Sequence, residues 1–234
     1  MRTVGILGTG RMGVRLAEAF AKSGNRVILG SRDVRRAERI TKGLAIETLT
    51  AGSYATAAAA EFVLPALFLR DGLLETLEPL RPHLGGKIFI DITNPFNADY
   101  SDFILPWHTS GAEAIRDRFP ETRVVGAFKN VWWEVFDAPQ FDGLPSDVFV
   151  VGDDQAAKED FFRIVEGMPF RFLDAGRLAN ARTVERMTLL SGELGLRYGY
   201  FPRMNYRLVG EPWQKGQADR YGALIAPAEL ELTP

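Results

Sequence analysis

Three glycines near the start of the chain constrain its fold more than any other feature. Gly8, Gly10 and Gly13 form a G-x-G-x-x-G pattern directly after a short apolar run. Between a strand and a helix, the first glycine permits a tight turn, the second lets backbone amides approach a pyrophosphate, and the third lets the helix pack closely on the strand. The pattern predicts a dinucleotide-binding site, with an ordinary glycine-rich turn as the alternative interpretation.

The residues after the glycines have the periodicity of an amphipathic helix. Met12, Leu16 and Phe20 recur at every fourth position, whereas charged side chains such as Arg15 fall on the opposite side. A second apolar run, residues 27–30, comes next. We expect a strand–turn–helix–strand unit in which the N-terminus of the helix faces the negative charge of the dinucleotide.

The end of the second predicted strand decides which dinucleotide is bound. NAD sites usually place an acidic residue about 20 residues after the glycines, where it binds the ribose 2′-hydroxyl. Ser31 and Arg32 occupy that point here, and a hydroxyl beside a guanidinium suits a 2′-phosphate. Asp33 fits two roles, the N-cap of the next helix or, with a shifted boundary, the NAD acid. We interpret it as the N-cap and predict NADP(H) as the cofactor.

The composition is that of an ordinary globular protein and excludes several classes of function. The 234 residues suffice for one sizeable domain, or for one domain and a small cap. A net charge of −2 gives no basic face for nucleic acid or an anionic membrane. The absence of cysteine excludes disulfides, iron–sulfur clusters and thiolate catalysis. No apolar run reaches the roughly 18 residues of a membrane span, and we expect a cytoplasmic protein without a signal peptide.

Strands and helices are predicted to alternate along the rest of the chain. The elements expected after residue 32 are helix 33–42, strand 44–48, helix 52–60, strand 61–68, helix 69–84, strand 87–92, helix 111–119, strand 123–128, strand 147–151, helix 155–167, strand 170–173 and helix 177–198. Connections of this kind give right-handed crossovers and a parallel sheet. We predict an α/β fold: a Rossmann-type, doubly wound, mostly parallel sheet with a small C-terminal helical cap. Residues 1–175 would bind NADP, and residues 176–234, a helix and a wrapping tail, would close the cleft.

Ligands of such sheets bind beyond the carboxyl ends of the strands, and this rule selects a few candidate residues. Ala66 and Leu67 stand near the end of one predicted strand, and Asn94 follows the next one. Asn94 and Asn130 are the polar groups best placed to meet a nicotinamide carboxamide or a substrate. Turn formation is the alternative, since asparagine before proline commonly starts a turn.

Lys129 is the main candidate for acid–base chemistry, and with Asn130 it makes up the predicted catalytic pair. It follows a predicted strand, where it fits a proton donor, an anion clamp or simply a surface lysine. Four aromatic residues come just after it: Trp132, Trp133, Phe136 and Phe141. They either stack on a flat heterocycle or belong to the core.

Motifs of other catalytic mechanisms are absent from the sequence. None of the six tyrosines begins a Tyr-x-x-x-Lys pair, and no His-Glu-x-x-His or other metal-binding spacing occurs. Reduction of a simple ketone needs a proton donor at the carbonyl oxygen, whereas a ring acceptor needs mainly orientation and exclusion of water. The sequence thus favours hydride transfer between two rings.

Five short motifs occur in the order found in one known family. They are Gly8-Thr-Gly-Arg-Met-Gly13, Gly30-Ser-Arg32, Asp91-Ile-Thr-Asn-Pro95, Val124-Val-Gly-Ala-Phe128 and Asp174-Ala-Gly-Arg-Leu-Ala-Asn180. With them the chain resembles the NADPH-dependent reductases of the 8-hydroxy-5-deazaflavin coenzyme F420. It is also similar to the reductase domain of the STEAP-type metalloreductases. The resemblance covers roughly residues 1–195.

The resemblance implies a homodimer and direct hydride transfer between the nicotinamide and the deazaflavin. It assigns the segment from Ala127 to Val131 to the neighbourhood of the nicotinamide. The residues that it assigns to the pyrophosphate are Thr9, Gly10, Arg11 and Met12. Those that it assigns to the 2′-phosphate are Ser31, Arg32 and Arg36.

Two segments depart from the family pattern, and both flank the acceptor side. The aromatic run from Lys129 to Glu134 stands where smaller residues are expected, and the tail from Phe201 to Pro234 has no clear counterpart. Fold and cofactor do not determine the second substrate. Three interpretations therefore stay open: the deazaflavin as acceptor; a flavin, ferric chelate, or small carbonyl or imine; and a sensor that binds NADP(H) without turnover.

Overall fold

Six parallel strands form the central sheet, in the order β3-β2-β1-β4-β5-β6. The computed structural model describes residues 1–212 of the chain. The strands are β1 (Thr3–Leu7), β2 (Arg26–Gly30), β3 (Leu49–Gly52), β4 (Phe62–Pro65), β5 (Ile88–Asp91) and β6 (Arg123–Gly126). The order changes direction beside β1, whose neighbours are β2 and β4. This topology confirms the predicted doubly wound, Rossmann-type fold.

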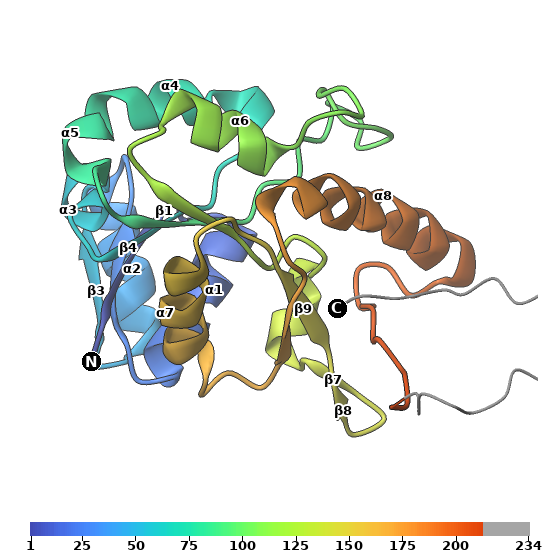
Figure 1. Ribbon diagram of the computed structural model, residues 1–234. Helices are drawn as coiled ribbons and strands as arrows, with labels where there is room; N and C mark the ends of the chain where they lie inside the picture. The colour runs from blue at the N-terminus through green and yellow to red at the C-terminus, as the bar shows by residue number, and fades with distance from the viewer. Residues whose placement is uncertain (213–234) are drawn as a thin grey trace, which may run out of the picture.

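Helices cover both faces of the sheet (Figure 1). One face carries α1 (Arg11–Lys22), α2 (Val34–Leu44) and α7 (Gln155–Val165), and the other carries α3 (Tyr54–Ala58), α4 (Leu73–Leu77), α5 (Arg81–Leu84) and α6 (Gly111–Arg118). Consecutive residues of β1 belong to the two different layers: Ile6 packs in the core cluster of α1, whereas Leu7 packs in that of α3 and α4. The period of two along the strand places them on opposite faces.

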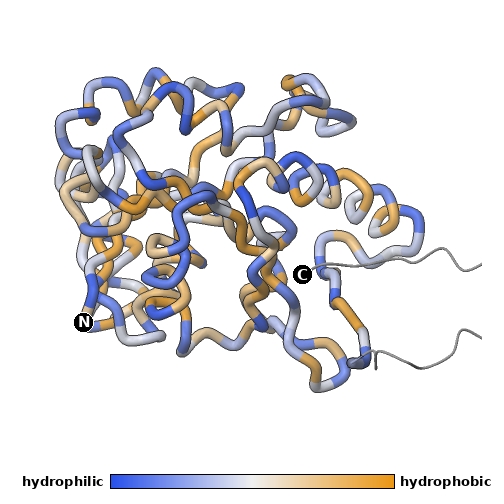
Figure 2. The backbone as a smooth tube through the Cα atoms, in the orientation of Figure 1, coloured by the Kyte–Doolittle hydropathy of each residue, from blue (hydrophilic) through white to orange (hydrophobic). Residues whose placement is uncertain are grey.

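Apolar side chains are concentrated in the strands at the centre of the molecule. The tube through these strands is largely orange in Figure 2, whereas the surrounding helices alternate between apolar and polar residues. All four residues of β4 and all four of β5 are buried. Parallel strands covered on both faces have this nearly continuous apolar character. Within residues 1–212 no helix is long and apolar enough to cross a membrane.

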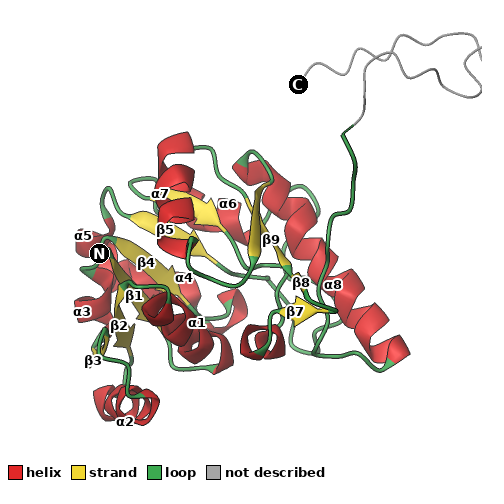
Figure 3. Ribbon diagram, turned by 90° about the horizontal axis from the view of Figure 1, so that it is seen from below, coloured by secondary structure: helices red, strands yellow, loops and turns green. Residues whose placement is uncertain are grey.

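The second half of the chain adds two small sheets and a long helix. Strands β9 (Asp147–Val150) and β10 (Arg171–Asp174) pair in parallel beside β6, while β7 (Gln140–Phe141) and β8 (Leu144–Pro145) form a hairpin that the sequence interpretation missed. Short 3-10 turns are η1 (Leu69–Asp71), η2 (Glu78–Leu80), η3 (Trp133–Asp137) and η4 (Leu178–Asn180). Helix α8 (Ala181–Tyr198) extends past the layers of the sheet, as Figure 3 shows.

Residues 200–209 run back from α8 to β9. The hydroxyl of Tyr206 donates to the carbonyl oxygen of Met187 in α8 at 2.7 Å, and the carbonyl oxygen of Tyr206 accepts from the N–H of Asp147 at 3.2 Å. The N–H of Leu208 donates to the Asp147 carboxylate at 2.6 Å. These bonds fasten α8 to the edge of the fold. The rest of the expected tail, residues 213–234, lies outside the described residues.

The predicted strand at residues 44–48 is wrong. Helix α2 continues to Leu44, and Ala45 ends it in the left-handed region with a φ of 52°. The N–H of Ala45 still bonds to the carbonyl oxygen of Thr41, so the helix keeps its backbone bonds up to this turn. The strand begins only at Leu49.

The single helix predicted over residues 69–84 is also wrong. Gly72 takes a φ of 81°, and Pro79 and Pro82 have no N–H to give to a helix. The segment consists instead of the short pieces η1, α4, η2 and α5. A similar local cause shortens the strand expected at 123–128, because Phe128 lies in the left-handed region with a φ of 56°.

Candidate functional site

Close backbone packing holds the glycine turn between β1 and α1. Gly8 has a φ of 124°, which residues with a Cβ rarely adopt, and a Cβ there would lie 2.8 Å from the carbonyl oxygen of Ala66. A Cβ on Gly13 would overlap the carbonyl oxygen of Gly8. The first and third glycines therefore serve the turn and the helix packing that the sequence predicts.

Gly10 differs from these two glycines because it faces open space. A Cβ built on Gly10 meets no atom within 4 Å. Gly10 is also the N-cap of α1; in the described part of the chain no side chain caps this helix, and its first turn has no acidic residue. The free N–H groups and the positive end of the helix dipole remain available to an anion. This cradle fits the pyrophosphate of a dinucleotide.

The other residues predicted to hold the pyrophosphate lie around the same turn. Arg11 is exposed at the first position of α1, and Thr9 is half-buried. Met12 packs its side chain against the hydrophobic core. Met12 can therefore meet a phosphate only through its backbone, whereas Arg11 can offer its charge.

The end of β2 places a hydroxyl and two exposed guanidinium groups beside the cradle. Ser31 is buried, and Arg32 and Arg36 are exposed. The Nη2 of Arg36 donates to the carbonyl oxygen of Thr9 at 3.2 Å, so this arginine reaches back to the glycine turn. Asp33 caps α2: its Oδ1 accepts from the N–H of Arg36 at 3.3 Å. The predicted N-cap role of Asp33 is thus confirmed.

Tyr54 joins this group, although the sequence interpretation missed it. It is the first residue of α3, at the carboxyl end of β3, and the charge of Arg32 is near enough to act on its phenol. Burial raises the pKa of Tyr54, and the nearby guanidinium of Arg32 opposes that rise only in part. The phenol therefore keeps its proton at neutral pH and can donate to a phosphate. Its place after a strand was the signal available in the sequence.

Ala66 and Leu67, predicted near the cofactor, lie directly against the glycine turn. The N–H of Ala66 donates to the carbonyl oxygen of Leu7 at 2.8 Å. The Cδ2 of Leu67 lies 3.4 Å from the Cβ position of Gly8. Both residues stand where the strand order changes direction, between β1 and β4, which is the point where ligands of this fold bind.

Lys129 is fully buried, so the alternative of a surface lysine is wrong. Its Nζ donates to Asp91 Oδ2 at 2.5 Å, to Glu185 Oε1 at 2.8 Å and to the carbonyl oxygen of Thr93 at 2.7 Å. Burial by itself lowers the pKa of Lys129, but the two carboxylates outweigh it and the pKa is raised. With three acceptors around the ammonium group, this geometry gives no support to a proton donor at the carboxyl edge of the sheet.

Asn130, the other predicted catalytic residue, is also fully buried and engaged. Its Nδ2 donates to the carbonyl oxygen of Asp147 at 2.8 Å and to Asn205 Oδ1 at 3.0 Å. Its Oδ1 accepts from the N–H of Phe149 at 3.2 Å. Asn130 thereby joins the end of β6 to β9 and to the segment after α8. Its bonds describe a structural role.

Asn94 and Ala127 lie closer to the expected nicotinamide position. The Nδ2 of Asn94 donates to the carbonyl oxygen of Lys129 at 2.7 Å, while its buried Oδ1 has no hydrogen-bond partner within residues 1–212. Ala127 is buried, and its N–H donates to the carbonyl oxygen of Asp91 at 2.9 Å. Asn94 therefore retains an unused acceptor at the carboxyl edge of the sheet, and Ala127 contributes backbone alone.

The four aromatic residues after Lys129 divide into two groups. Trp132, Phe136 and Phe141 pack against the hydrophobic core, and Trp133 does not belong to that cluster. The Nε1 of Trp132 donates to Ser191 Oγ in α8 at 2.9 Å, and the guanidinium of Arg11 lies 5.0 Å from the centre of the Trp133 ring. Packing in the core is thus confirmed for three of the four, and stacking on a heterocycle stays a prediction.

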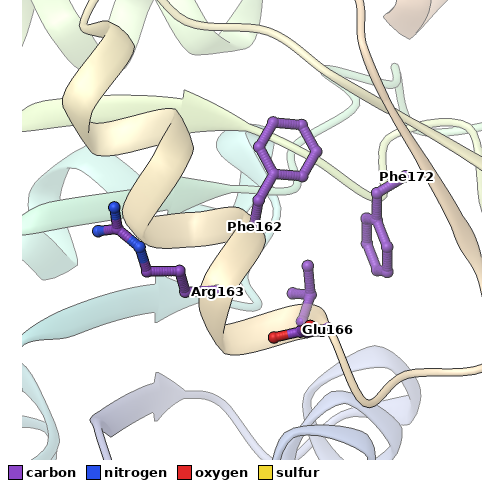
Figure 4. Close-up of a pocket in the computed structure, with 5 residues that line it drawn as sticks. Phe162, Arg163, Glu166 and Phe172 are labelled. Atoms are coloured by element: carbon purple, nitrogen blue, oxygen red, sulfur yellow. The ribbon is translucent and has the colours of Figure 1, made fainter.

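A surface pocket of about 360 Å³ lies elsewhere, between α7 and β10 (Figure 4). Its lining residues are Phe162, Arg163, Val165, Glu166 and Phe172. None of them belongs to the glycine turn or to the carboxyl ends of β1 to β6. Convergent polar groups at the strand ends identify a ligand site in this fold better than an apolar gap on its flank.

Comparison with known proteins agrees with this geometry. Residues 3–95 match the family described as coenzyme F420-dependent NADP oxidoreductase. The chain is 29% identical over 211 residues to the F420-dependent NADP reductase of Methanothermobacter thermautotrophicus, covering 84% of this chain and 90% of that enzyme. It is 32% identical over 186 residues to metalloreductase STEAP3 of Rattus norvegicus, covering 80% of this chain but only 36% of STEAP3. The chain thus spans about a third of the length of that relative.

Solved structures give the same result. A crystal structure from Arthrobacter, to which F420-dependent NADP reductase activity is ascribed, has a TM-score of 0.75 and 25% identity, covering 85% of this chain and 95% of that one. An imine reductase from Myxococcus stipitatus has a TM-score of 0.62 at 16% identity, covering 85% of this chain and 63% of that one, and shares the fold alone. The predicted resemblance is confirmed: by sequence and by fold, the chain is similar to the F420-dependent NADP reductases.

Proposed function

We propose that the chain transfers a hydride between NADP(H) and a deazaflavin-type ring acceptor. The observation that carries the cofactor assignment is the uncapped N-terminus of α1 at Gly10, beside a cluster of Arg32, Arg36 and Tyr54. The cradle would hold the pyrophosphate, and the cluster would hold the 2′-phosphate together with Ser31.

The polarity of the β2 end favours NADP(H) over NAD(H). The nearest carboxylate, Asp33, caps α2 and so is already engaged by the backbone of its own helix. A carboxylate that bound a ribose 2′-hydroxyl would also repel a 2′-phosphate, whereas Arg32 and Arg36 attract it. The preference therefore comes from two exposed cations and from the use of Asp33 as a cap.

The nicotinamide would lie at the carboxyl ends of β5 and β6. Asn94 and Ala127 stand there, and the unused Oδ1 of Asn94 can accept from an N–H of the carboxamide. In this proposal residues 1–175 bind the cofactor, and the segment from residue 176 closes the cleft. When bound, the nicotinamide supplies the hydride; the chain supplies orientation and exclusion of water.

The bonds of Lys129 and Asn130 support a ring acceptor rather than a simple carbonyl. Both side chains are buried and bonded to other parts of the fold. A carbonyl oxygen would need a proton donor as the hydride arrives, whereas a conjugated ring delocalises the charge and can take its proton from water. The similarity to F420-dependent reductases favours the deazaflavin among such rings.

The test is to mix the protein with oxidised deazaflavin coenzyme and either NADPH or NADH, and to follow the visible absorbance of the coenzyme. The proposal predicts bleaching with NADPH and little with NADH. If NADPH quenches tryptophan fluorescence but no bleaching occurs, the deazaflavin is rejected. Flavins, ferric chelates and imines are then the acceptors to try, and a chain that reduces none of them is a sensor.

We also propose that the protein forms a homodimer through α8. Leu190, Leu194 and Tyr198 form one stripe along this helix and are 54%, 40% and 63% exposed. An apolar stripe of this kind is typical of a helix that packs against another surface. Light scattering should give twice the monomer mass, and Leu190→Glu with Leu194→Glu should give the monomer; a monomeric wild type would contradict the proposal.

A further inference from the structure

A row of five aromatic rings runs along the carboxyl edge of the sheet. Neighbouring ring centres are separated by 6.0, 5.3, 6.2 and 5.8 Å in the order Phe68, Tyr100, Phe96, Trp132, Trp133. Phe68 follows β4, Phe96 follows β5 and Trp132 follows β6. The row therefore crosses the ends of three adjacent strands and reaches Arg11 at the start of α1, beside the glycine cradle.

Arg70 occupies the other end of this row. Its guanidinium carbon lies 4.4 Å from the ring centre of Phe68 and 4.4 Å from that of Tyr100. The Nη1 donates to the carbonyl oxygens of Phe96 and Asn97, at 3.2 and 2.5 Å. The cation is thereby fixed between two rings by bonds to the loop after β5.

The charge of Arg70 is only weakly compensated. The nearest carboxylate, on Asp71, is 64% exposed and lies 3.8 Å from the Nε, beyond hydrogen-bonding distance. Within residues 1–212 the Nη2 has no acceptor. A guanidinium carries five N–H donors, so Arg70 retains several for a ligand. The side chain of Arg70 is only 17% exposed, so water and salt screen its charge less than they screen a free surface charge.

Phe68 and Tyr100 remain accessible beside this cation. They are 40% and 48% exposed, although large aromatic side chains usually lose most of their surface to the core. Tyr100 also has a φ of 63°, an uncommon conformation for a residue with a side chain. Two exposed rings in contact with a cation form a surface that suits a flat, conjugated and negatively charged molecule.

We propose that Phe68, Arg70 and Tyr100 form a subsite for the second substrate, which is a flat conjugated ring bearing an anionic group. The planes of Phe68 and Tyr100 lie at 78° to each other, so the ring stacks on Tyr100 and meets Phe68 edge-on, and Arg70 binds the anion. This inference rests on the proposed function, because it places the acceptor at the same edge of the sheet as the nicotinamide. It adds which residues select the acceptor and which charge the acceptor carries.

Binding of two matched flavins tests the subsite without any turnover. Riboflavin 5′-phosphate and riboflavin share one ring system, and only the first carries an anion; their fluorescence reports binding to the NADP⁺-loaded protein. We expect the phosphate form to bind about tenfold more tightly than riboflavin, from charge-assisted bonds to Arg70. Arg70→Met should remove this difference, and Arg70→Lys should keep part of it. Tyr100→Ala should weaken both flavins, since it removes a stacking face.

Two matched controls distinguish the subsite from a general effect. Trp107, in the same loop, is 75% exposed and lies 3.6 Å from the guanidinium of Arg186, but it is not in the row. Arg81, in the helix that precedes β5, lies 4.8 Å from the ring of Phe119. Trp107→Ala and Arg81→Met should leave both flavins unaffected. Thermal unfolding of each variant shows whether it is folded, and Tyr100→Ala, at an exposed position, provides the test if Arg70→Met does not fold.

The outcomes separate this inference from the proposed function. Equal binding of the two flavins, an unchanged preference in Arg70→Met, or an equal loss in Trp107→Ala and Tyr100→Ala would overturn the subsite. If the subsite variants behave as expected but NADPH reduces no ring acceptor, the subsite stands and the proposed hydride transfer fails. If NADPH reduces the deazaflavin equally well in wild type, Arg70→Met and Tyr100→Ala, the hydride transfer stands and the subsite fails.

Discussion

The two halves of the sheet differ in whether their polar groups are exposed or buried. Around β1 to β3, the backbone N–H groups at Gly10 and the guanidinium groups of Arg32 and Arg36 lie at the surface. Around β5 and β6, the charged groups Lys129 and Asp91 are buried and bonded to each other. The first half keeps its charge for a ligand, and the second half uses its charge to hold the fold together.

This difference indicates which groups of the protein recognise each ligand. A dinucleotide phosphate is recognised by exposed cations and a helix N-terminus. On the acceptor side Lys129 and Asp91 are bonded to each other inside the fold, so the groups left for an acceptor are aromatic rings and the cation of Arg70. Substitutions in the two halves should therefore affect different properties.

The largest effect is expected from Lys129→Met. It leaves the buried carboxylates of Asp91 and Glu185 without their cation, which should lower the free energy of unfolding by about 3–5 kcal/mol. Urea unfolding measures this change. Lys22→Met is the control, because Lys22 is 66% exposed and its ion pair in the described part of the chain is with Glu18 on its own helix. A loss below about 1 kcal/mol, the range of surface pairs, would contradict the conclusion that the buried charges around β5 and β6 stabilise the fold.

Arg32→Ala should act on the cofactor and not on the fold. We expect it to weaken NADPH binding by about 1.5–3 kcal/mol, the range for hydrogen bonds to charged groups, and to leave NADH nearly unchanged. Titration calorimetry with both nucleotides gives the comparison. Arg35→Ala, on the same helix start and also exposed, is the matched control. Equal losses for NADPH and NADH would contradict the assignment of the 2′-phosphate site.

Tyr54→Phe sharpens the same assignment with a smaller change. The ring stays and only the hydroxyl beside Arg32 is removed. NADPH should weaken by about 0.5–1.5 kcal/mol, as for one ordinary hydrogen bond, and NADH should not change. If both nucleotides bind as in wild type, Tyr54 orients Arg32 without reaching the phosphate.

Asp154→Asn should give the smallest effect, present at neutral pH and lost in acid. The Nε of Arg123 bonds Asp154 at 2.6 Å and lowers the pKa of that carboxyl from 3.8 to about 2. Because the folded-state pKa is lowered, the stabilisation is present above pH 3.8 and is lost as the pH falls through about 2. Asparagine still caps α7, so the stability gap between wild type and variant should narrow from pH 5 to pH 2. A constant gap would contradict the charge assignment.

The sequence allowed most of the sheet and the cofactor end to be predicted. The G-x-G-x-x-G turn, the capping by Asp33 and the polar end of β2 are local patterns, which can be recognised in the sequence without knowledge of the fold. The turn of the β7–β8 hairpin could also have been recognised, since Asp142 and Gly143 form the Asp-Gly pair with positive φ that favours such turns.

The environment of Lys129 could not be predicted in the same way. Its partners Asp91 and Glu185 lie 38 and 56 residues away in the chain. The pairing of β5 with β6 brings Asp91 to it, and the packing of α8 brings Glu185. A lysine at the end of a strand is more often exposed, so burial had no local signal. The aromatic row has the same origin, because Phe68, Phe96 and Trp132 follow three different strands.

Transfer of an isotope label tests the central claim of NADP(H)-linked hydride transfer most directly. The protein would be mixed with deazaflavin coenzyme and NADPH deuterated at nicotinamide C4, in each of its two configurations, and the reduced coenzyme analysed by mass spectrometry. The account predicts that one of the two labelled forms passes its deuterium to the acceptor ring. Deuterium that stays on the nucleotide or appears in water with both forms would contradict direct transfer between the two rings.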